Sequence, residues 1–239
     1  MSKILITICA RGGSIGIPKK NIKEINKLPL IAYSIETAKA YSKKYKVKIA
    51  ISSDDTEILS VAKHYGLNTQ YHRPQGLSGS TVGKIEVLRD LLLHEESTCG
   101  VKYDYLIDLD VTSPLRSLSD IEKAFEKLKN SEAYNIFSVS KASRNPYFNM
   151  VEKKKGQEYV EIIKSTDEFL TRQNAPDVFD MNASFYIYKR SFFDEQFTSS
   201  ITPKSLAYVM NHICFDIDEP IDLLIMDFLI SNGHLDFEL

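Results

Sequence analysis

The 239-residue sequence contains no apolar run near the ~20 residues that a membrane-spanning helix requires. It also begins without a basic segment followed by an apolar one and a small-residue cleavage site. Neither positive nor negative charge dominates, because 30 basic and 32 acidic side chains leave a formal net charge of −2. No general electrostatic attraction to nucleic acid or to a membrane surface is therefore expected. We expect a soluble, cytoplasmic protein with a small partner.

Cysteine is scarce. Cys9, Cys99 and Cys214 are odd in number, lie in or beside apolar segments, and lack the Cys/His spacing of a structural zinc site. We expect reduced thiols in the core of a cytosolic protein.

The chain has no internal repeat, no low-complexity tract and no Gly-, Ser- or Pro-rich linker. Strand-like runs occupy residues 3–8, 47–52, 103–109, 135–140 and 183–189, and helical patterns lie between most of them. This alternation predicts one α/β domain over residues 1–239, with a parallel or mixed sheet covered on both faces.

Three segments show the 3.6-residue periodicity of helices: residues 28–41, 55–66 and 119–130. The second is expected to begin at Asp54 or Asp55, and Ser119 is the expected cap of the third. Residues 141–182 contain short alternating pieces and a "KKKG" turn but no long helix. This composition predicts an insertion that forms a flap or a subunit contact.

The stretch "CARGGSIGIPKKN", residues 9–21, joins the first strand to the first helix through a glycine-rich loop. Glycines allow backbone N–H groups to converge on a phosphate, and Arg11, Lys19 and Lys20 supply positive charge. An ordinary turn is the alternative, but clustered cations favour a bound anion. The spacing matches neither the Walker pattern nor G-x-G-x-x-G, which disfavours a kinase-type loop and a dinucleotide site.

Polar residues also follow the strand in "LIDLDVTSPLRS", residues 106–117. Ligands of open α/β sheets bind beyond the carboxyl ends of strands, so these side chains are candidates for contact with a ligand. They are Asp108, Asp110, Thr112, Ser113 and Arg116. The alternative is a structural cap and turn.

In "FDIDEP", residues 215–220, Asp216 and Asp218 are two residues apart. Side chains at this spacing on an extended segment project to the same side, where both carboxylates could bind one Mg²⁺ together with substrate phosphate oxygens. A simple helix start at Glu219-Pro220 is the alternative. Together, the three motifs predict a nucleoside triphosphate held with Mg²⁺, and hence phosphoryl or nucleotidyl transfer.

The segments "ARGGSIGIPKKNI", "RPQGLSGST", "TSPLRS", "DMNASFYIYKR" and "FDIDEPIDL" together resemble the CMP-nonulosonate synthetases, which activate sialic-acid-like sugars with CTP. The segments "SRNPYFNM" and "TRQNAP" are most similar to those of bacterial enzymes that make CMP-N,N'-diacetyllegionaminic acid. The resemblance implies a Rossmann-like, three-layer nucleotidyltransferase domain with a mixed sheet. It also implies a homodimer in which the insertion at about 141–182 reaches the neighbouring subunit.

The resemblance further implies roles for individual residues. Arg11, Lys20 and Asp216 are expected to be catalytic, and Asp216 and Asp218 to bind Mg²⁺. The expected nucleotide contacts are Ala10, Arg11, Gly12, Gly13, Ser14, Lys20, Asn21, Arg73 and Ser80, and the expected sugar contacts are Asp110, Phe148, Arg172, Asn182 and Tyr186.

Some positions depart from the family pattern. Ile15 stands where lysine is usual, Lys84 where a serine that contacts cytidine is common, and Phe148 and Asp180 where sialic-acid enzymes often carry basic residues. A less basic sugar pocket fits a sugar with a deoxygenated, methyl-ended tail, as legionaminic acid has. Arg172 or Arg144 would then bind the sugar carboxylate. The alternatives are the N-acetylneuraminic or 3-deoxy-octulosonic acid enzyme, or a nucleotide-binding regulatory protein without turnover.

Overall fold

The computed structural model describes residues 2–14, 16–164 and 175–239, so Ile15 and Arg172 lie outside the described residues. The strands are β1 (Ile4–Cys9), β2 (Glu24–Ile25), β3 (Leu28–Pro29), β4 (Val47–Ser52), β5 (Tyr105–Leu109), β6 (Asn135–Lys141), β7 (Val151–Glu152), β8 (Glu161–Ile162), β9 (Phe179–Lys189) and β10 (Ser205–Val209). The helices are α1 (Leu30–Lys44), α2 (Thr56–His64), α3 (Lys84–Cys99), α4 (Leu118–Lys129), α5 (Arg190–Asp194) and α6 (Pro220–Ser231), with short 3₁₀ turns at Lys20–Ile22 and Gln75–Leu77.

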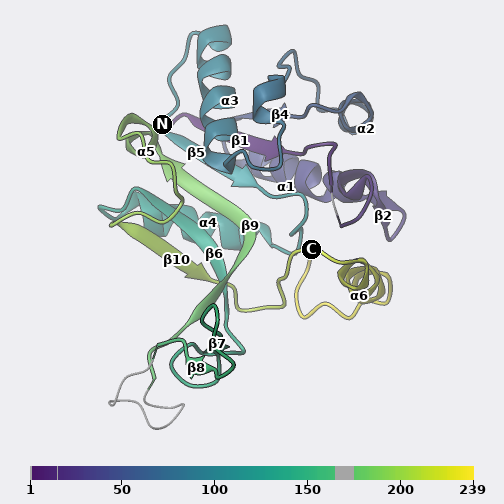
Figure 1. Cartoon of the computed structure of the whole chain (residues 1–239). Helices are drawn as coiled ribbons and strands as arrows, with labels where there is room; N and C mark the ends of the chain where they lie inside the picture. Colours follow the sequence, from purple (N-terminus) through teal and green to yellow (C-terminus); the bar gives the residue numbers. More distant parts are fainter. Residues whose placement is uncertain (1, 15, 165–174) are drawn as a thin grey trace.

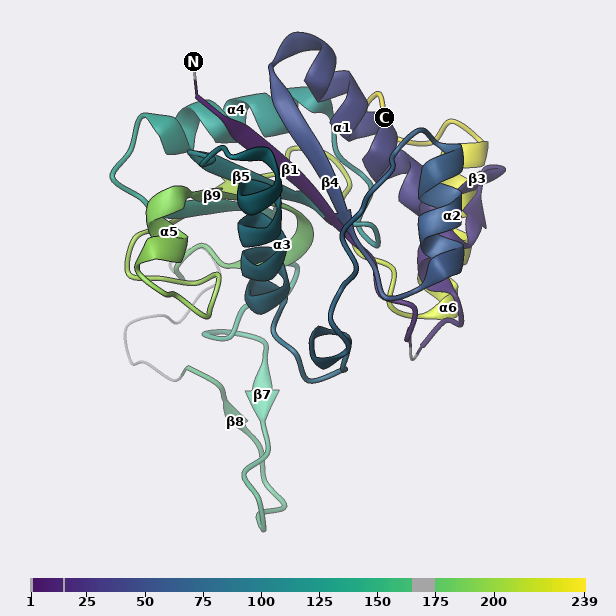
Figure 2. The same cartoon turned by 90° about the horizontal axis from the view of Figure 1, so that it is seen from above.

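Six strands form one mixed sheet in the order β10-β6-β9-β5-β1-β4. Strand β1 pairs in parallel with both β4 and β5, and β6 pairs in parallel with β10. Strand β9 runs antiparallel between β5 and β6. Helices cover both faces, with α1 and α4 on one and α3 and α5 on the other (Figures 1 and 2). The prediction of a three-layer α/β fold with a mixed sheet is confirmed.

The two faces of the sheet bury separate apolar cores because successive strand residues point to opposite sides. In β1, Ile4, Ile6 and Ile8 belong to the larger core, on the side of α1 and α4. Leu5 belongs to the smaller core, which includes side chains of α3 and α5. Thr7 continues the smaller-core side of β1, yet it is polar and completely buried. A polar group thus replaces apolar packing where β1 approaches its carboxyl end.

Two helix starts test the capping predictions. Asp55 caps α2 as predicted, because its Oδ1 accepts from the N–H of Glu57 at 2.7 Å. The prediction for α4 was wrong: Ser117, not Ser119, is the cap. Ser117 and Asp120 form a capping box in which each side chain accepts from the other's backbone N–H.

Replacing Ser117 by alanine is expected to lower the free energy of unfolding by about 1 kcal/mol, since the cap of α4 is lost. Ser119→Ala is a matched control, because Ser119 is an exposed residue inside the helix, where such changes cost less than about 0.5 kcal/mol. Urea denaturation of both variants measures the difference. Equal losses would show that the capping box does not stabilise α4.

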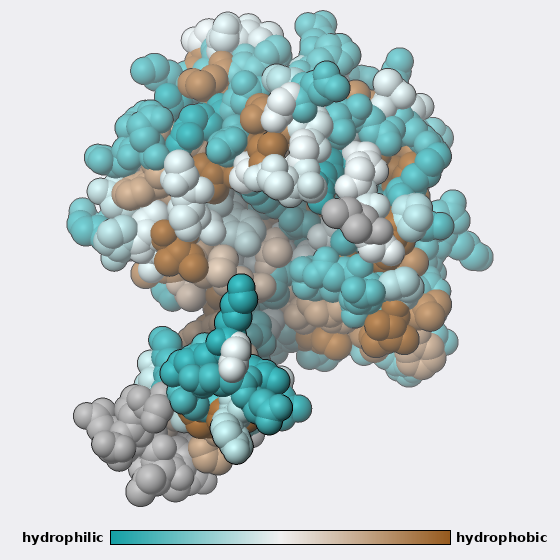
Figure 3. Space-filling view, in the orientation of Figure 1, coloured by the Kyte–Doolittle hydropathy of each residue, from teal (hydrophilic) through white to brown (hydrophobic). Residues whose placement is uncertain are grey.

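The predicted insertion leaves the sheet as an arm. Strands β7 and β8 pair antiparallel within it, and Figures 1 and 2 show this hairpin extending away from the helices and the main sheet. In Figure 3 the arm is a separate lobe below the main body. Several large apolar side chains in or beside the arm are exposed: Phe148, Met150, Val151, Tyr159, Val160, Ile163, Phe179 and Met181. The arm therefore carries apolar surface that its own chain leaves uncovered.

The three cysteines are free thiols, as predicted, but they are not all in the core. Cys9 and Cys214 are partly buried, whereas Cys99 is exposed at the last position of α3. Among the described residues, no helix has the length and apolar character needed to cross a membrane.

Candidate active site

The glycine-rich loop follows β1 and turns back beside α2. A Cβ on Gly12 would lie 2.6 Å from Asp55 Oδ2, and one on Gly16 would lie 2.6 Å from the backbone oxygen of Asp218. Both positions therefore require glycine for close approach. Asn21 is buried, and its Nδ2 donates to the backbone oxygen of Arg11 at 2.8 Å, which fixes the start of the loop.

Not every N–H of this loop faces the cavity that the loop lines. The N–H of Gly12 donates to Asp54 Oδ1 at 3.0 Å, and that of Ser14 donates to the backbone oxygen of Gly12 at 3.0 Å. These two groups bond within the protein, which the glycine pattern did not predict. Contact of Ala10, Gly12, Gly13 and Ser14 with a nucleotide stays a prediction.

Lys20 connects this loop to the segment before α6. Its Nζ donates to the backbone oxygen of Ile217 and lies 3.3 Å from Asp218 Oδ1. Only 14% of the Lys20 side chain is exposed. By contrast, the neighbouring Lys19 forms an ion pair with Glu57 and is 61% exposed. Lys20 is therefore enclosed, whereas Lys19 lies at the surface.

Arg73 is fixed at the end of β4. Its Nε and Nη2 donate to Oγ and the backbone oxygen of Ser52, the last residue of β4, at 2.8 and 2.7 Å. These bonds hold the buried guanidinium at the carboxyl end of the sheet. Ser80 lies exposed on the connection between Arg73 and α3.

A cavity of about 410 Å³ lies between these elements. Its lining includes the predicted residues Arg11, Ser14, Lys20, Asn21, Arg73, Ser80, Asp110 and Asp218. Side chains from distant parts of the chain therefore meet at the carboxyl ends of β1, β4 and β5, where open α/β sheets bind ligands. The cations Arg11 and Lys20 lie at the glycine-rich loop, so this part of the cavity suits an anion.

Asp216 and Asp218 lie on the extended segment that leads into α6. Burial raises the pKa of Asp216, and the negative charge of Asp218 raises it further. Neither side chain caps the helix, because Glu219 and Asp222 form its capping box. The helix start expected at Glu219-Pro220 is confirmed, but the side chains of Asp216 and Asp218 do not cap it, and binding of Mg²⁺ by this pair stays a prediction. The described residues contain no group of three or more His, Cys, Asp or Glu side chains that could hold a metal ion.

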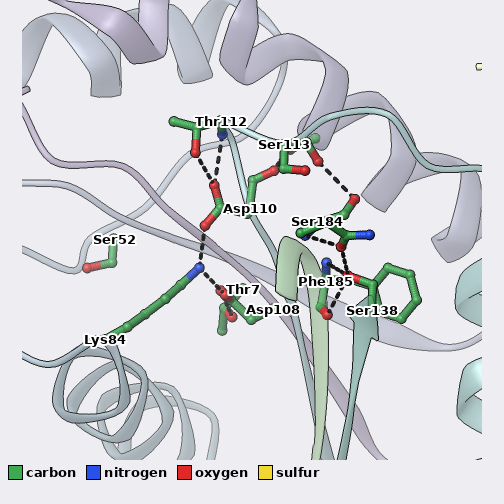
Figure 4. Close-up of polar contacts among 12 residues, drawn as sticks. Thr7, Ser52, Lys84, Asp108, Asp110, Thr112, Ser113, Ser138, Ser184 and Phe185 are labelled. Carbon is green, nitrogen blue, oxygen red and sulfur yellow. Dashed lines mark hydrogen bonds and ion pairs between the residues drawn. The ribbon is translucent and has the colours of Figure 1, made fainter. Parts of the chain in front are cut away.

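An ion cluster that the motifs did not predict lies at the end of β5 (Figure 4). Lys84 Nζ is 2.7 Å from Asp108 Oδ2 and 2.6 Å from Asp110 Oδ2. We call these three residues the Lys84 cluster. Asp108 also accepts from Thr7 Oγ1 at 2.8 Å, which explains the buried polar residue in β1. Burial, and next the charge of Asp108, raise the pKa of the adjacent Cys9 thiol to about 12, so Cys9 stays protonated.

One signal in the sequence could have predicted this cluster. Lys84 is the first residue of α3, and a cation is unfavourable at a helix N-terminus. Nearby negative charge would favour a lysine there, and Asp108, in β5, and Asp110, just after it, are two residues apart, a spacing that places both on one side of an extended segment.

The polar residues after β5 divide into two groups. Asp110 and Thr112 line the cavity. Ser113 and Arg116 are buried, and Arg116 donates to the backbone oxygens of Asp110, Ser113 and Ser184. The interpretation of Ser113 and Arg116 as ligand contacts was wrong, because they bind the loop to β9 instead.

The predicted sugar contacts lie in different places. Tyr186, on β9, has Lys84 Nζ 5.4 Å from its ring centroid. Asn182 is 4% exposed, and its side chain bonds to Ser138 and Ser140 of β6, beside Ala183, whose φ of 58° lies in the left-handed region. Phe148 is exposed on the arm, and Arg172 lies outside the described residues. Sugar contact by each stays a prediction.

The mixed sheet, the loop after β1 and the polar cavity define an α/β protein with a ligand site at the carboxyl ends of its parallel strands. Comparison with solved structures agrees with this fold. The chain resembles a CMP:2-keto-3-deoxy-manno-octonic acid synthetase solved with CTP, with a TM-score of 0.66 over 97% of this chain and 100% of that one. At 16% identity this likeness shows the fold alone.

Sequence comparison identifies the family. The cytidylyltransferase family model matches residues 5–226. The chain is 44% identical to a CMP-N,N'-diacetyllegionaminic acid synthase of Campylobacter jejuni, over 98% of both chains. It is also 44% identical to the post-translational flagellin modification protein B of Campylobacter coli, again over 98% of both. The chain belongs to the cytidylyltransferase family.

Proposed function

We propose that this protein couples CTP with N,N'-diacetyllegionaminic acid, a nonulosonic acid, and releases CMP-sugar and pyrophosphate. The 44% identity to an enzyme named for this product, over 98% of both chains, is the observation that carries the proposal. The cavity supports it, because it combines a cationic end for a triphosphate with a separate polar end at Asp110 and Thr112.

The cationic end suits the triphosphate of CTP. Arg11 and Lys20 both line the cavity, and Lys20 is largely enclosed, so its charge is weakly screened by water. Arg73, held by Ser52, and Ser80 on the same wall would then face the cytidine.

The acid pair fits Mg²⁺. Asp216 carries a carboxylate whose pKa is raised by burial and by Asp218, so a cation would offset both effects. Mg²⁺ usually takes one or two carboxylates and completes its coordination with water and substrate phosphates, which suits a site with only two acids. Asp216 and Asp218 would hold the ion. When bound, it supplies charge neutralisation at the phosphates.

The reaction is an in-line displacement at the α-phosphorus. The C2 hydroxyl oxygen of the sugar forms a bond to phosphorus while the bond to the pyrophosphate oxygen breaks. Arg11 and Lys20 bind the phosphates and oppose the charge of the leaving group. We assign the hydroxyl proton to a carboxylate oxygen of Asp216 as general base. No covalent enzyme intermediate is required.

We also propose that the protein is a cytoplasmic homodimer with the insertion at its interface. Exposed apolar side chains on the arm, including Tyr159 at 85% exposure, support a protein partner for this surface. Helix α6 adds a second exposed apolar stripe at helical spacing, formed by Ile221, Leu224, Ile225 and Phe228. Sedimentation of the full chain tests the dimer, and deletion of the hairpin between residues 150 and 163 should yield monomers.

Pyrophosphate release with a panel of sugars tests the substrate. We expect kcat/KM for N,N'-diacetyllegionaminic acid to exceed that for N-acetylneuraminic or 3-deoxy-octulosonic acid by at least about tenfold, because each differs in groups the pocket must pair or pack. A preference for either of those sugars would replace the substrate assignment. CTP binding without pyrophosphate release for any sugar would identify a nucleotide-binding regulatory protein.

A further inference from the structure

Two residues of the Lys84 cluster line the cavity. Lys84 and Asp110 both line the cavity, and 34% of the Lys84 side chain is exposed. Asp108 is completely buried behind them. Figure 4 shows Lys84 reaching from the start of α3 to the two carboxylates, with Thr112 beyond Asp110. The cluster thus presents one lysine and one carboxylate to whatever occupies this part of the cavity.

The charge of the cluster differs from that of the glycine-rich loop. One ammonium and two carboxylates give the cluster a net charge of −1. At the loop, Arg11 and Lys20 face one acid of the lining, Asp218. A ligand with several negative charges is therefore attracted to the loop, whereas the cluster favours an uncharged group that donates hydrogen bonds.

Asp110 is held in one orientation. Its Oδ2 accepts from Lys84, and its Oδ1 accepts from both the N–H and Oγ1 of Thr112 at 2.8 Å. Burial alone would raise the pKa of Asp110, but Lys84 and then Thr112 lower it below its ordinary value. A carboxylate offers about four lone-pair directions, so this fixed, ionised group still has accepting capacity for a ligand.

We propose that Lys84 is a positioning residue that keeps Asp110 ionised and fixed, so that this end of the cavity accepts hydroxyl or amide N–H groups of the sugar and excludes its carboxylate. The proposal rests on the proposed function, because it takes the sugar acid as the ligand at Asp110. Under this proposal, Lys84 helps to determine the orientation of the sugar. The hydroxyl and amide N–H groups of the sugar point toward the cluster, and its carboxylate points away from it.

Other charged or titratable groups also face the cluster. They are Cys9 on β1, Arg73 before α3, Arg116 before α4, Tyr186 and Tyr188 on β9, and Asp216 before α6. Arg73 and Arg116 are tied to other partners, and burial raises the pKa of Cys9 and of both tyrosines. Lys84 is the cation in contact with both carboxylates.

The first measurement is the thermal midpoint between about pH 5.5 and about pH 8.5 for the wild type, Lys84→Met, Lys84→Arg and the triple variant Lys84→Met/Asp108→Asn/Asp110→Asn. The pKa of Asp110 is lowered in the wild type, so its contribution to stability is present above the ordinary pKa and is lost only in stronger acid. Ionisation of Asp110 should therefore cause no change in the thermal midpoint of the wild type across this pH range.

Lys84→Met leaves two close carboxylates without a cation, which raises the pKa of one of them. Stability from a group with a raised pKa is present at low pH and is lost as the pH rises through that pKa. The midpoint of Lys84→Met should therefore fall toward pH 8.5, while Lys84→Arg and the triple variant, which has no titratable group left in the cluster, should follow the wild type. If Lys84→Met follows the wild type instead, Lys84 does not control the ionisation of Asp110 and the proposal is overturned.

The second measurement separates sugar binding from nucleotide binding. With Lys84→Met we expect the sugar KM to rise by about tenfold or more at pH 8.5 and by less at pH 6, because a proton shared by the acids restores the original charge. The KM for CTP should change by less than about threefold. Equal changes in both KM values with no pH dependence would overturn the proposal. A wild type that uses no nonulosonic acid would refute the proposed function, and the thermal measurement would still decide the control of Asp110 by Lys84.

Discussion

Replacing Asp216 by asparagine should lower kcat by at least about 100-fold while leaving the fold intact. The variant loses an anionic ligand for Mg²⁺ and the group to which we assign the hydroxyl proton, and metal stabilisation of this kind is worth several kcal/mol at about 1.4 kcal/mol per tenfold. Because burial and Asp218 raise the pKa of Asp216, its charge opposes folding at neutral pH. Asp216→Asn should therefore have an equal or higher thermal midpoint. Pyrophosphate release over a Mg²⁺ titration and thermal melting measure both effects.

Asp222→Ala is the matched control for this prediction. Asp222 Oδ2 accepts from the N–H groups of Asp218 and Glu219 at 3.0 and 2.8 Å, so it stabilises the start of α6. Its loss should cost about 1 kcal/mol of stability, while turnover stays well above that of Asp216→Asn. If Asp216→Asn instead lost stability as Asp222→Ala does and retained its kcat, Asp216 would be part of the helix start and not of the site.

Replacing Lys20 by alanine should lower kcat/KM for CTP by about ten- to 100-fold, because a charge-assisted hydrogen bond to phosphate is typically worth ~1.5–3 kcal/mol. Lys20 is enclosed and lines the cavity, so water cannot replace its contact cheaply. Steady-state kinetics with CTP varied at saturating sugar measure the loss.

Lys19→Ala provides the comparison within the same loop. Lys19 is largely exposed and pairs with Glu57, and such surface ion pairs contribute about 0–1 kcal/mol. Its loss should change kcat/KM by less than about threefold. Similar losses for Lys19→Ala and Lys20→Ala would mean that the loop attracts CTP by general charge and makes no specific contact through Lys20.

The local patterns of the sequence were sufficient for much of the fold. Asp55 before an amphipathic run identified α2 and its cap. The prediction failed for α4, where Ser117 and Ser119 both precede acidic residues at short spacing. The structure decides between them, because Ser117 has the extended backbone conformation of a cap. The antiparallel direction of β9 could not be predicted either, because strand patterns do not specify which neighbour a strand pairs with.

The candidate site was predicted where the ligand groups occur in short motifs. Arg11, Lys20 and Asp218 lie in two such motifs and meet at one cavity. Lys84 was recognised only as a departure from a family pattern, since its partners Asp108 and Asp110 are 24 and 26 residues away along the chain. Arg116 was interpreted as a ligand contact because its actual partner, the backbone oxygen of Ser184, is 68 residues away along the chain. Long-range pairings of this kind are not visible in local spacing.

The close contact between Gly16 and the backbone of Asp218 joins the glycine-rich loop to the C-terminal segment of the chain. The main sheet is complete at Val209, the end of β10. The cavity is not, because Asp218 is one of its walls and Lys20 bonds to Ile217 and Asp218. The C-terminal segment therefore closes the cavity and also fills part of the larger core, to which the buried Ile217 and Met226 belong, so the sheet alone cannot form the nucleotide site.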